Sequence, residues 1–184
     1  MSKYSLVIYP DKRLKRVAQP VKNFDQELKE DAEAMFEIMY AKKGIGLAAT
    51  QIALDKRLIV MDVPRENAEG KIPEEDSPDY VKEKLVLVNP EILEFSQECK
   101  DHEEGCLSLP NQFATVSRPA KIKVKFFDLE GKEIIKEADG LLAVCIQHEI
   151  DHLNGIVFIE HISRLKKERI EAKLAKEKKR KNEE

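Results

Sequence analysis

The stretch DGLLAVCIQHEIDHLNG, residues 139–155, is the most informative part of this 184-residue chain. It is rich in apolar residues and predicts a buried helix over residues 140–154. Asp139 is a suitable N-cap for this helix, and Gly155 is a suitable residue to end it. We therefore expect a central helix inside the domain.

Two histidines on this helix, His148 and His152, are four residues apart and would lie on one face. Two imidazoles in this arrangement can bind one metal ion, with Glu149 beside the open coordination site. Such a glutamate can take a proton from the attacking water and pass it to a leaving group. The alternative is two unrelated histidines on a polar face. With a third ligand, the pattern predicts a metal-dependent hydrolase.

The third ligand is not expected in the same stretch. Zinc proteases with a longer version of this signature carry a third histidine where this chain has Phe158, and His161 comes three residues too late. Glu160 follows the glycine turn and an apolar run, which places it out of reach. An endopeptidase of the zinc-protease type is therefore disfavoured.

Cys106 is the best candidate for the third ligand. It lies in EGCLS, residues 104–108, where Gly105 lets the backbone approach closely. A soft thiolate would complete a set of one sulfur and two nitrogens, with a fourth position open. The commoner fate of a lone cysteine is that of a small buried apolar residue, and we expect it for Cys99 and Cys145.

A third stretch, GIGLAATQ at residues 44–51, is rich in glycine and small residues. It lacks the third glycine of a dinucleotide-binding fingerprint and the lysine of a phosphate-binding loop. Gly46 could let an extended peptide pair with the backbone, and Gln51 could donate its amide to a developing oxyanion. Tight packing after a helix is the alternative explanation.

Around the central helix the sequence predicts antiparallel strands and an amphipathic helix over residues 24–42. The expected strands are residues 57–63, 85–88, 121–127 and 133–137. The acidic stretch 64–84, with three prolines, is expected to be a flexible insertion between neighbouring strands. The predicted fold class is α+β, with antiparallel β-sheets around a central metal-binding helix and a C-terminal α-helix.

Charge is distributed unevenly along the chain. The net formal charge is −3, yet residues 164–184 hold ten Lys and Arg against five Asp and Glu. We expect a catalytic domain over 1–163 and a basic helical tail over 164–184, whose first half docks and whose second half frays into solvent. No apolar run is long enough to span a membrane, the N-terminal one is too short for a secretory signal, and three cysteines do not suggest a disulfide framework. A cytoplasmic location is therefore expected.

Taken together, the three stretches resemble the peptide deformylases, which remove the N-formyl group from nascent bacterial polypeptides. That family shows Gly-x-Gly-Leu-Ala-Ala-x-Gln, Glu-Gly-Cys-Leu-Ser and Gln-His-Glu-x-x-His-Leu-x-Gly in this order. They match residues 44–51, 104–108 and 147–155 of this chain. The similarity extends from about residue 5 to about residue 165, so it covers most of the chain.

The resemblance implies a role for each matching residue. The metal ligands would be Cys106, His148 and His152. Glu149 would be the general acid and base, while Gln51 and the backbone N–H of Leu107 would bind the formyl oxygen as it becomes anionic. The substrate peptide would pair with the backbone at Ile45, Gly46 and Gly105. The pocket for the methionine side chain would be bordered by Leu141, Val144, Cys145 and His148.

The resemblance also implies a cofactor and partners. The expected substrates are N-formyl-methionyl peptides, and no membrane partner is expected. The cofactor would be one divalent ion, ferrous iron in the cell, although the same donors accept zinc, nickel or cobalt. The basic tail would dock on ribosomal RNA near the exit tunnel, or else it is only a solubilising end.

Three features depart from the family pattern. His102 replaces an aliphatic residue near the pocket mouth, Phe113 replaces an arginine found in some members, and the insertion at 64–84 is long. The changes at His102 and Phe113 concern the rim of the site and not its chemistry, and the sequence gives no functional account of the insertion. A catalytically inactive member that keeps only the fold is disfavoured, because every catalytic position holds the required type of residue.

Overall fold

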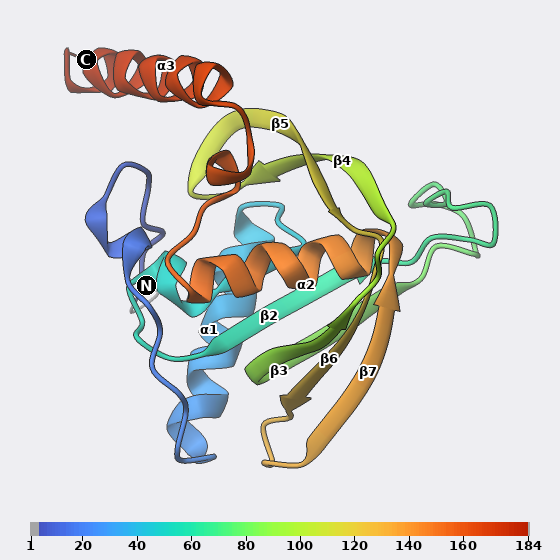
Figure 1. The fold of residues 1–184 in the computed structure, drawn as a ribbon. Coiled ribbons are helices and arrows are strands. Elements are labelled where there is room, and N and C mark those ends of the chain that lie inside the picture. Colours follow the sequence, from blue (N-terminus) through green and yellow to red (C-terminus); the bar gives the residue numbers. More distant parts are fainter. Residues whose placement is uncertain (1–3, 184) are drawn as a thin grey trace.

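Helix α2 (Gly140–Leu153) lies against a five-stranded sheet, with a two-stranded sheet beside it (Figure 1). The structure, a computed structural model, describes residues 4–183. The larger sheet has the order β1-β2-β3-β6-β7 and the smaller one pairs β4 with β5, in each case antiparallel. The strands are β1 (Gly46–Ala48), β2 (Leu58–Pro64), β3 (Lys82–Phe95), β4 (Cys99–Cys106), β5 (Leu109–Pro119), β6 (Lys121–Phe127) and β7 (Glu133–Asp139).

Two further α-helices and three short 3-10 turns complete the described chain. The helices are α1 (Gln26–Ala41) and α3 (Arg164–Glu183). The turns are η1 (Lys12–Lys15), η2 (Ala49–Ile52) and η3 (Phe158–His161). The predicted α+β fold, with its central helix and its C-terminal helix, is confirmed.

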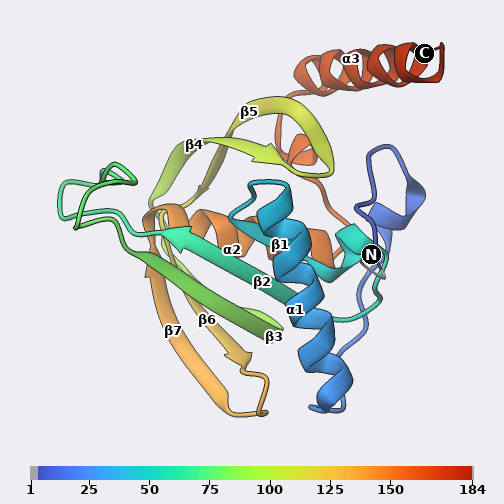
Figure 2. The same ribbon diagram turned by 180° about the vertical axis from the view of Figure 1, so that it is seen from behind.

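Strand β2 contributes to a hydrophobic core on each face of the large sheet. Figures 1 and 2 show α2 on one face of this sheet and α1 on the other. Ile59 and Met61 pack in the core on the α2 side, whereas Leu58 and Val60 pack with residues of α1. Alternate side chains of a strand point to opposite faces, so an uninterrupted apolar run supplies both cores.

The predicted strands 121–127 and 133–137 correspond to β6 and β7, and the strand at 85–88 is the middle of the longer β3. The sequence does not predict β1 or the β4–β5 hairpin. In β4 most side chains are exposed and polar, with Glu104 the buried exception, so the strand has no apolar alternation. The sequence therefore indicated Cys106 in EGCLS as a candidate ligand but did not predict the strand on which it lies.

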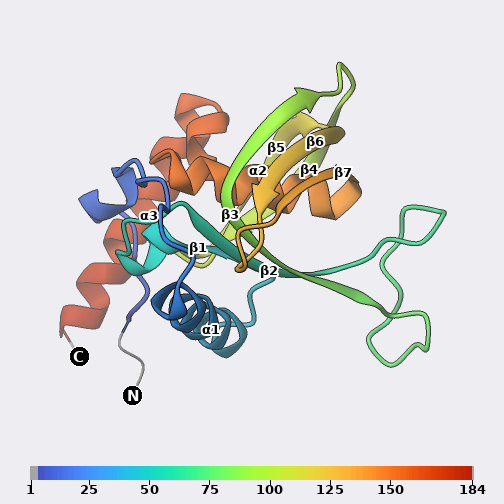
Figure 3. The ribbon, with the colours of Figure 1, turned by 90° about the horizontal axis from the view of Figure 1, so that it is seen from below.

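The predicted insertion connects two neighbouring strands, as expected. Strands β2 and β3 pair from Leu58 with Val88 to Pro64 with Lys82, so residues 65–81 form the connection between them. Figure 3 shows this connection extending away from the sheet.

Two local expectations are wrong, and a third is confirmed only in position. Asp139 occupies the N-cap position of α2, as expected, but its side chain makes no capping hydrogen bond. Cys99 is exposed at the start of β4 and is not a small buried apolar residue, whereas Cys145 is buried as expected. Helix α3 does not fray in its second half but continues to Glu183.

The first half of α3 docks, as expected. Ile170 and Leu174 are buried in a cluster with Phe158 of η3, and the Tyr9 hydroxyl donates a hydrogen bond to Glu171. Beyond Leu174 most side chains up to Arg180 are exposed. Figure 1 accordingly shows this end of α3 projecting beyond the sheets.

Candidate metal centre and active site

The three predicted metal ligands lie together. His148 and His152 are one turn apart on α2, and Cys106 is at the end of β4. One ligand atom from each lies within 4.8 Å of the others, and Sγ of Cys106 is 3.1 Å from Nε2 of His152. Within residues 4–183 this is the only such group of His, Cys, Asp and Glu side chains.

The donors of this group suit a divalent transition metal. A thiolate and two imidazoles without a fourth protein ligand are typical of catalytic sites, which keep one position open. Nδ1 of His148 is 2.8 Å from Oε2 of Glu104, which leaves Nε2 of this ring as its ligand atom. Nδ1 of His152 is buried without a protein partner. Burial keeps the pKa of His152 well below its usual value, so this imidazole is in the neutral form that metals require.

A buried ion-pair network supports His148 and was not predicted from the sequence. Arg118 on β5 donates to Glu104 at 2.5 and 3.0 Å and to Oδ2 of Asp151 at 2.8 Å. Asp151 also lies 2.7 Å from Nε2 of His161. Burial alone would raise the pKa of Glu104, but hydrogen bonds from His148 and Arg118 and their charges lower it to about 2. Glu104 is therefore an anion that orients the His148 ring.

Glu149 lies next to the three metal-ligand candidates, and its Oε2 atom is buried without a hydrogen-bond partner. Burial raises the pKa of its carboxyl to about 7. An added Cβ at Gly46 would lie 2.7 Å from Oε1 of Glu149 and 2.8 Å from Sγ of Cys145. Only glycine at position 46 therefore leaves room for the carboxylate.

The amide of Gln51 is held in one orientation. Its Oε1 accepts the Ala48 N–H at 2.8 Å, while its Nε2 donates to Oγ of Ser108 at 3.1 Å. Nε2 is also 3.5 Å from Sγ of Cys106. The amide donor thus faces the group of metal-ligand candidates.

A cavity of about 500 Å³ opens onto these groups. Every residue predicted for the site lines this cavity except His152, which is buried and does not reach its surface. Its lining includes Ile45, Gly46, Gln51, Gly105, Cys106, Leu107, Leu141, Val144, Cys145, His148 and Glu149. The structure thus brings together residues from β1, η2, β4 and α2.

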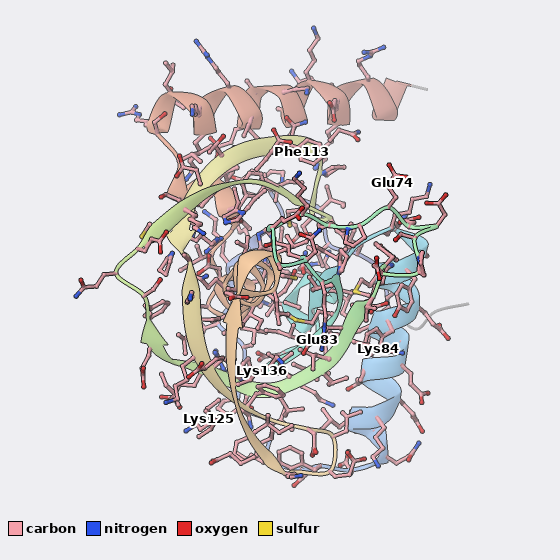
Figure 4. All side chains as sticks on the ribbon, turned by 90° about the vertical axis from the view of Figure 1, so that its right-hand side faces the viewer. Glu74, Glu83, Lys84, Phe113, Lys125 and Lys136 are labelled. Atoms are coloured by element: carbon pink, nitrogen blue, oxygen red, sulfur yellow. The ribbon has the colours of Figure 1, made fainter. Side chains whose placement is uncertain are left out.

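The cavity is also lined by residues to which the sequence analysis assigned no role: Leu6, Lys42, Lys43, Glu103, Pro110 and Asn111. Phe113, labelled in Figure 4, also lines the cavity, whereas His102 does not. An added Cβ at Gly105 would lie 2.6 Å from the Phe113 ring, so a glycine is needed opposite this aromatic residue. Of the two residues that depart from the family pattern, only Phe113 lines the cavity.

This arrangement defines a class of protein. A three-donor metal centre, a buried carboxylate beside it and a partly apolar cavity together are the features of a metal-dependent hydrolase. In the part of the chain that the structure describes, no helix is both long enough and apolar enough to cross a membrane.

Comparisons with known proteins identify the family. A family model described as polypeptide deformylase matches residues 3–168. The chain is 50% identical over 171 residues to a peptide deformylase of Methylocella silvestris, covering 93% of this chain and 83% of the relative. The crystal structure of peptide deformylase from Ehrlichia chaffeensis has a TM-score of 0.84 and 41% identity, covering 95% of this chain and 96% of the other.

A further crystal structure, of Met-Ala-Ser-bound peptide deformylase from Acinetobacter baumannii, has a TM-score of 0.76 and 38% identity, covering 88% of this chain and all of the other. The chain belongs to the polypeptide deformylase family. Its activity is the hydrolysis of the N-formyl group from the N-terminal formyl-methionine of nascent polypeptides, with release of formate. This assignment sets aside the zinc-protease alternative.

Proposed function

We propose that Cys106, His148 and His152 hold the metal ion of this deformylase and that Glu149 is its general acid and base. The observation that carries the proposal is the buried, unpartnered Oε2 atom of Glu149 beside the three-donor group. When bound, the ion acts as a Lewis acid toward the formyl carbonyl and the attacking water. Ferrous iron is the ion we propose for the active enzyme, and zinc, nickel or cobalt would also fit these donors.

Glu149 would accept a proton from the attacking water and return it to the departing amine. Oε2 of Glu149 has no other hydrogen bond and is therefore free to accept this proton. Because the atom is buried, bulk water does not compete for it. The net reaction consumes one water and yields formate and a free methionyl N-terminus.

Gln51 and the backbone N–H of Leu107 would stabilise negative charge on the formyl oxygen. The Gln51 amide is already fixed by its bonds to Ala48 and Ser108, so no reorientation is needed during the reaction. Leu107 follows the ligand Cys106 directly, which puts its N–H at the same end of the cavity.

The substrate peptide would lie as an added strand between Gly46 and Gly105. Strand β1 is at the edge of the large sheet and pairs only with β2, so its other edge is available to a peptide. Ile45 is fixed here because its carbonyl accepts the Asp62 N–H at 2.9 Å. The first side chain of the peptide would pack against Leu141, Val144 and Cys145.

Release of formate from formyl-Met-Ala-Ser, with and without a chelator, tests this assignment. The related protein from Acinetobacter baumannii has Met-Ala-Ser bound, the product expected from such a peptide. Glu149→Gln should keep the metal and the fold but lose about 10²–10⁴-fold in turnover, because the amide cannot accept the proton. A variant that kept more than about a tenth of the wild-type kcat/KM would refute the role of Glu149.

Metal analysis of protein purified without oxygen tests the identity of the ion. We expect close to one equivalent of iron, with activity that falls as the iron oxidises or is lost. Full activity with zinc alone would refute the proposal that iron is the ion of the active enzyme.

We also propose that the basic tail, residues 164–184, docks the enzyme on the ribosome near the exit tunnel in the cytoplasm, while residues 1–163 form the catalytic domain. The end of α3 projects from the domain, and five Lys and Arg follow Leu174. Truncation after Leu174 keeps the buried contacts of Ile170 and should leave hydrolysis of a short formyl peptide unchanged. The full-length protein should co-sediment with ribosomes, and less of it should do so as the salt concentration rises. The truncated protein should not co-sediment. Equal co-sedimentation of both proteins would leave the tail as solvated surface.

A further inference from the structure

The insertion between β2 and β3 contacts the start of α2 through Glu66. Oε1 of Glu66 accepts the backbone N–H of Leu141 at 2.9 Å. This N–H belongs to the first turn of the helix, where backbone donors have no partner within the helix. Asp139, at the N-cap itself, makes no such bond through its side chain. The cap of α2 is therefore supplied by a residue more than seventy positions away in the sequence.

Gly140 makes this contact possible. Its φ of +52° is a conformation that glycine adopts readily, and an added Cβ would overlap Oε2 of Glu66. The chain therefore turns into α2 with its backbone directly against the Glu66 carboxylate.

Hydrogen bonds and ion pairs hold the base of the insertion against the sheet, and they fix the position of the backbone at Glu66. The Arg65 N–H donates to the Val81 carbonyl at 2.8 Å, which continues the pairing of β2 with β3 by one residue. Glu83 binds Arg65 at 3.2 Å and Lys136 of β7 at 2.6 Å. Figure 4 shows Glu83 and Lys136 close together below the insertion. Strand β7 leads directly into α2, so both sides of the contact are tied to the same sheet.

We propose that Glu66 is a positioning residue, which caps the first turn of α2 and so holds the wall of the cavity against which the first side chain of the substrate packs. Leu141 lines both the active-site cavity and the hollow beneath the base of the insertion. The inference rests on the proposed function, which places the substrate's methionine side chain against Leu141. It gives the insertion a role in substrate binding.

The contact acts on the wall and not on the metal centre. His148 follows Leu141 by seven residues, which is about 10 Å along a helix. Loosening the first turn would move Leu141 while the later turns stay packed in the core. An interaction lost equally from bound substrate and transition state raises KM and leaves kcat unchanged.

The test compares four variants on formyl-Met-Ala-Ser and formyl-Ala-Ala-Ser, using metal-loaded enzyme. Glu66→Ala removes the cap, whereas Glu66→Gln keeps an acceptor oxygen and loses only the charge. Glu69→Gln is the matched control, since Glu69 is a nearby acid of the same insertion whose side chain makes no hydrogen bond in the described structure. Asp139→Ala tests the residue that occupies the N-cap without capping.

Glu66→Ala should raise KM for the formyl-Met peptide by about three- to fivefold, the scale of one lost cap. Its kcat, its metal content and its KM for the formyl-Ala peptide should match wild type, because alanine is too short to reach the wall. Glu66→Gln should show a smaller rise, and Glu69→Gln and Asp139→Ala none.

A rise below about twofold in Glu66→Ala, or an equal rise for both peptides, overturns the inference. So does a loss of kcat at constant KM, which would mean general destabilisation. A wild-type enzyme that showed no preference for formyl-Met over formyl-Ala would instead overturn the pocket assignment of the proposed function, and the inference with it.

Discussion

Replacing Arg118 with methionine removes a buried cation while keeping most of its apolar volume. The Arg118 side chain is 6% exposed and donates to Glu104 and Asp151, and the Glu104 side chain is 3% exposed. Without Arg118, the Glu104 carboxylate keeps only His148 as a hydrogen-bond partner among the described residues. Removing one member of a buried ion pair costs about 3–5 kcal/mol. At about 2–4 °C per kcal/mol for a domain of this size, Tm should fall by roughly 10 °C.

Thermal unfolding, followed by circular dichroism, measures this loss. Excess chelator in every sample keeps metal occupancy the same, so that a weakened metal site does not add to the effect. Arg164→Met is the matched control, because Arg164 pairs with Glu168 at the surface with side chains 91% and 53% exposed. That exposed pair should contribute well under about 1 kcal/mol.

A double variant separates the lost ion pair from lost packing. Glu104→Gln in the Arg118→Met background removes the orphaned carboxylate, so part of the stability should return. A Tm of Arg118→Met within about 2 °C of that of Arg164→Met would mean that the buried ion pair contributes no more than the exposed one, since each kcal/mol should move Tm at least that far. Either that result or a double variant less stable than Arg118→Met alone would refute the prediction.

Two further changes test the site itself. Cys106→Ala should lose the metal ion and Cys99→Ala should keep it; metal analysis of both proteins checks this, and one full equivalent of tightly bound metal in Cys106→Ala would contradict the ligand assignment. Gly46→Ala should lower kcat/KM at least tenfold, because the new methyl would overlap the Glu149 carboxylate and the Cys145 sulfur. Activity near wild type in a formate-release assay would show that these two side chains can move aside without loss of function.

The sequence contained enough information for the central helix because its signals are local. Two histidines four residues apart fall on one face of any helix, and the apolar density of 139–155 requires burial. Strand β2 was predictable for the same reason, since a strand buried on both faces appears as an uninterrupted apolar run.

Contacts between distant segments were not predictable from such signals. Arg118 pairs with Glu104 across the β4–β5 hairpin, and neither strand has an alternation that reveals the pairing. The N-cap position of Asp139 was predictable because it directly precedes the helix, but the hydrogen bond from Leu141 to Glu66 was not, because Glu66 lies 75 residues away in the sequence. Glu104, immediately before Gly105 and Cys106, could have indicated the buried network, because an acid buried beside a ligand candidate needs a cationic partner.

The position of Cys106, the third proposed metal ligand, relative to His148 and His152 depends on side-chain contacts, because Cys106 lies on a different element of the fold. His148 and His152 are fixed by one helix, but Cys106 belongs to a hairpin that approaches α2 from the other sheet. Three connections hold that approach: Glu104 contacts His148, Arg118 contacts Asp151 one turn further along, and Nε2 of Gln147 donates to the Pro119 carbonyl at 3.1 Å. Because Glu104 precedes Cys106 by two residues, any rotation of the hairpin that moved the thiol would also break the bond to the imidazole. The ion-pair network therefore sets the spacing of the three donors as well as the stability of the domain, and its loss should weaken metal binding even where the protein stays folded.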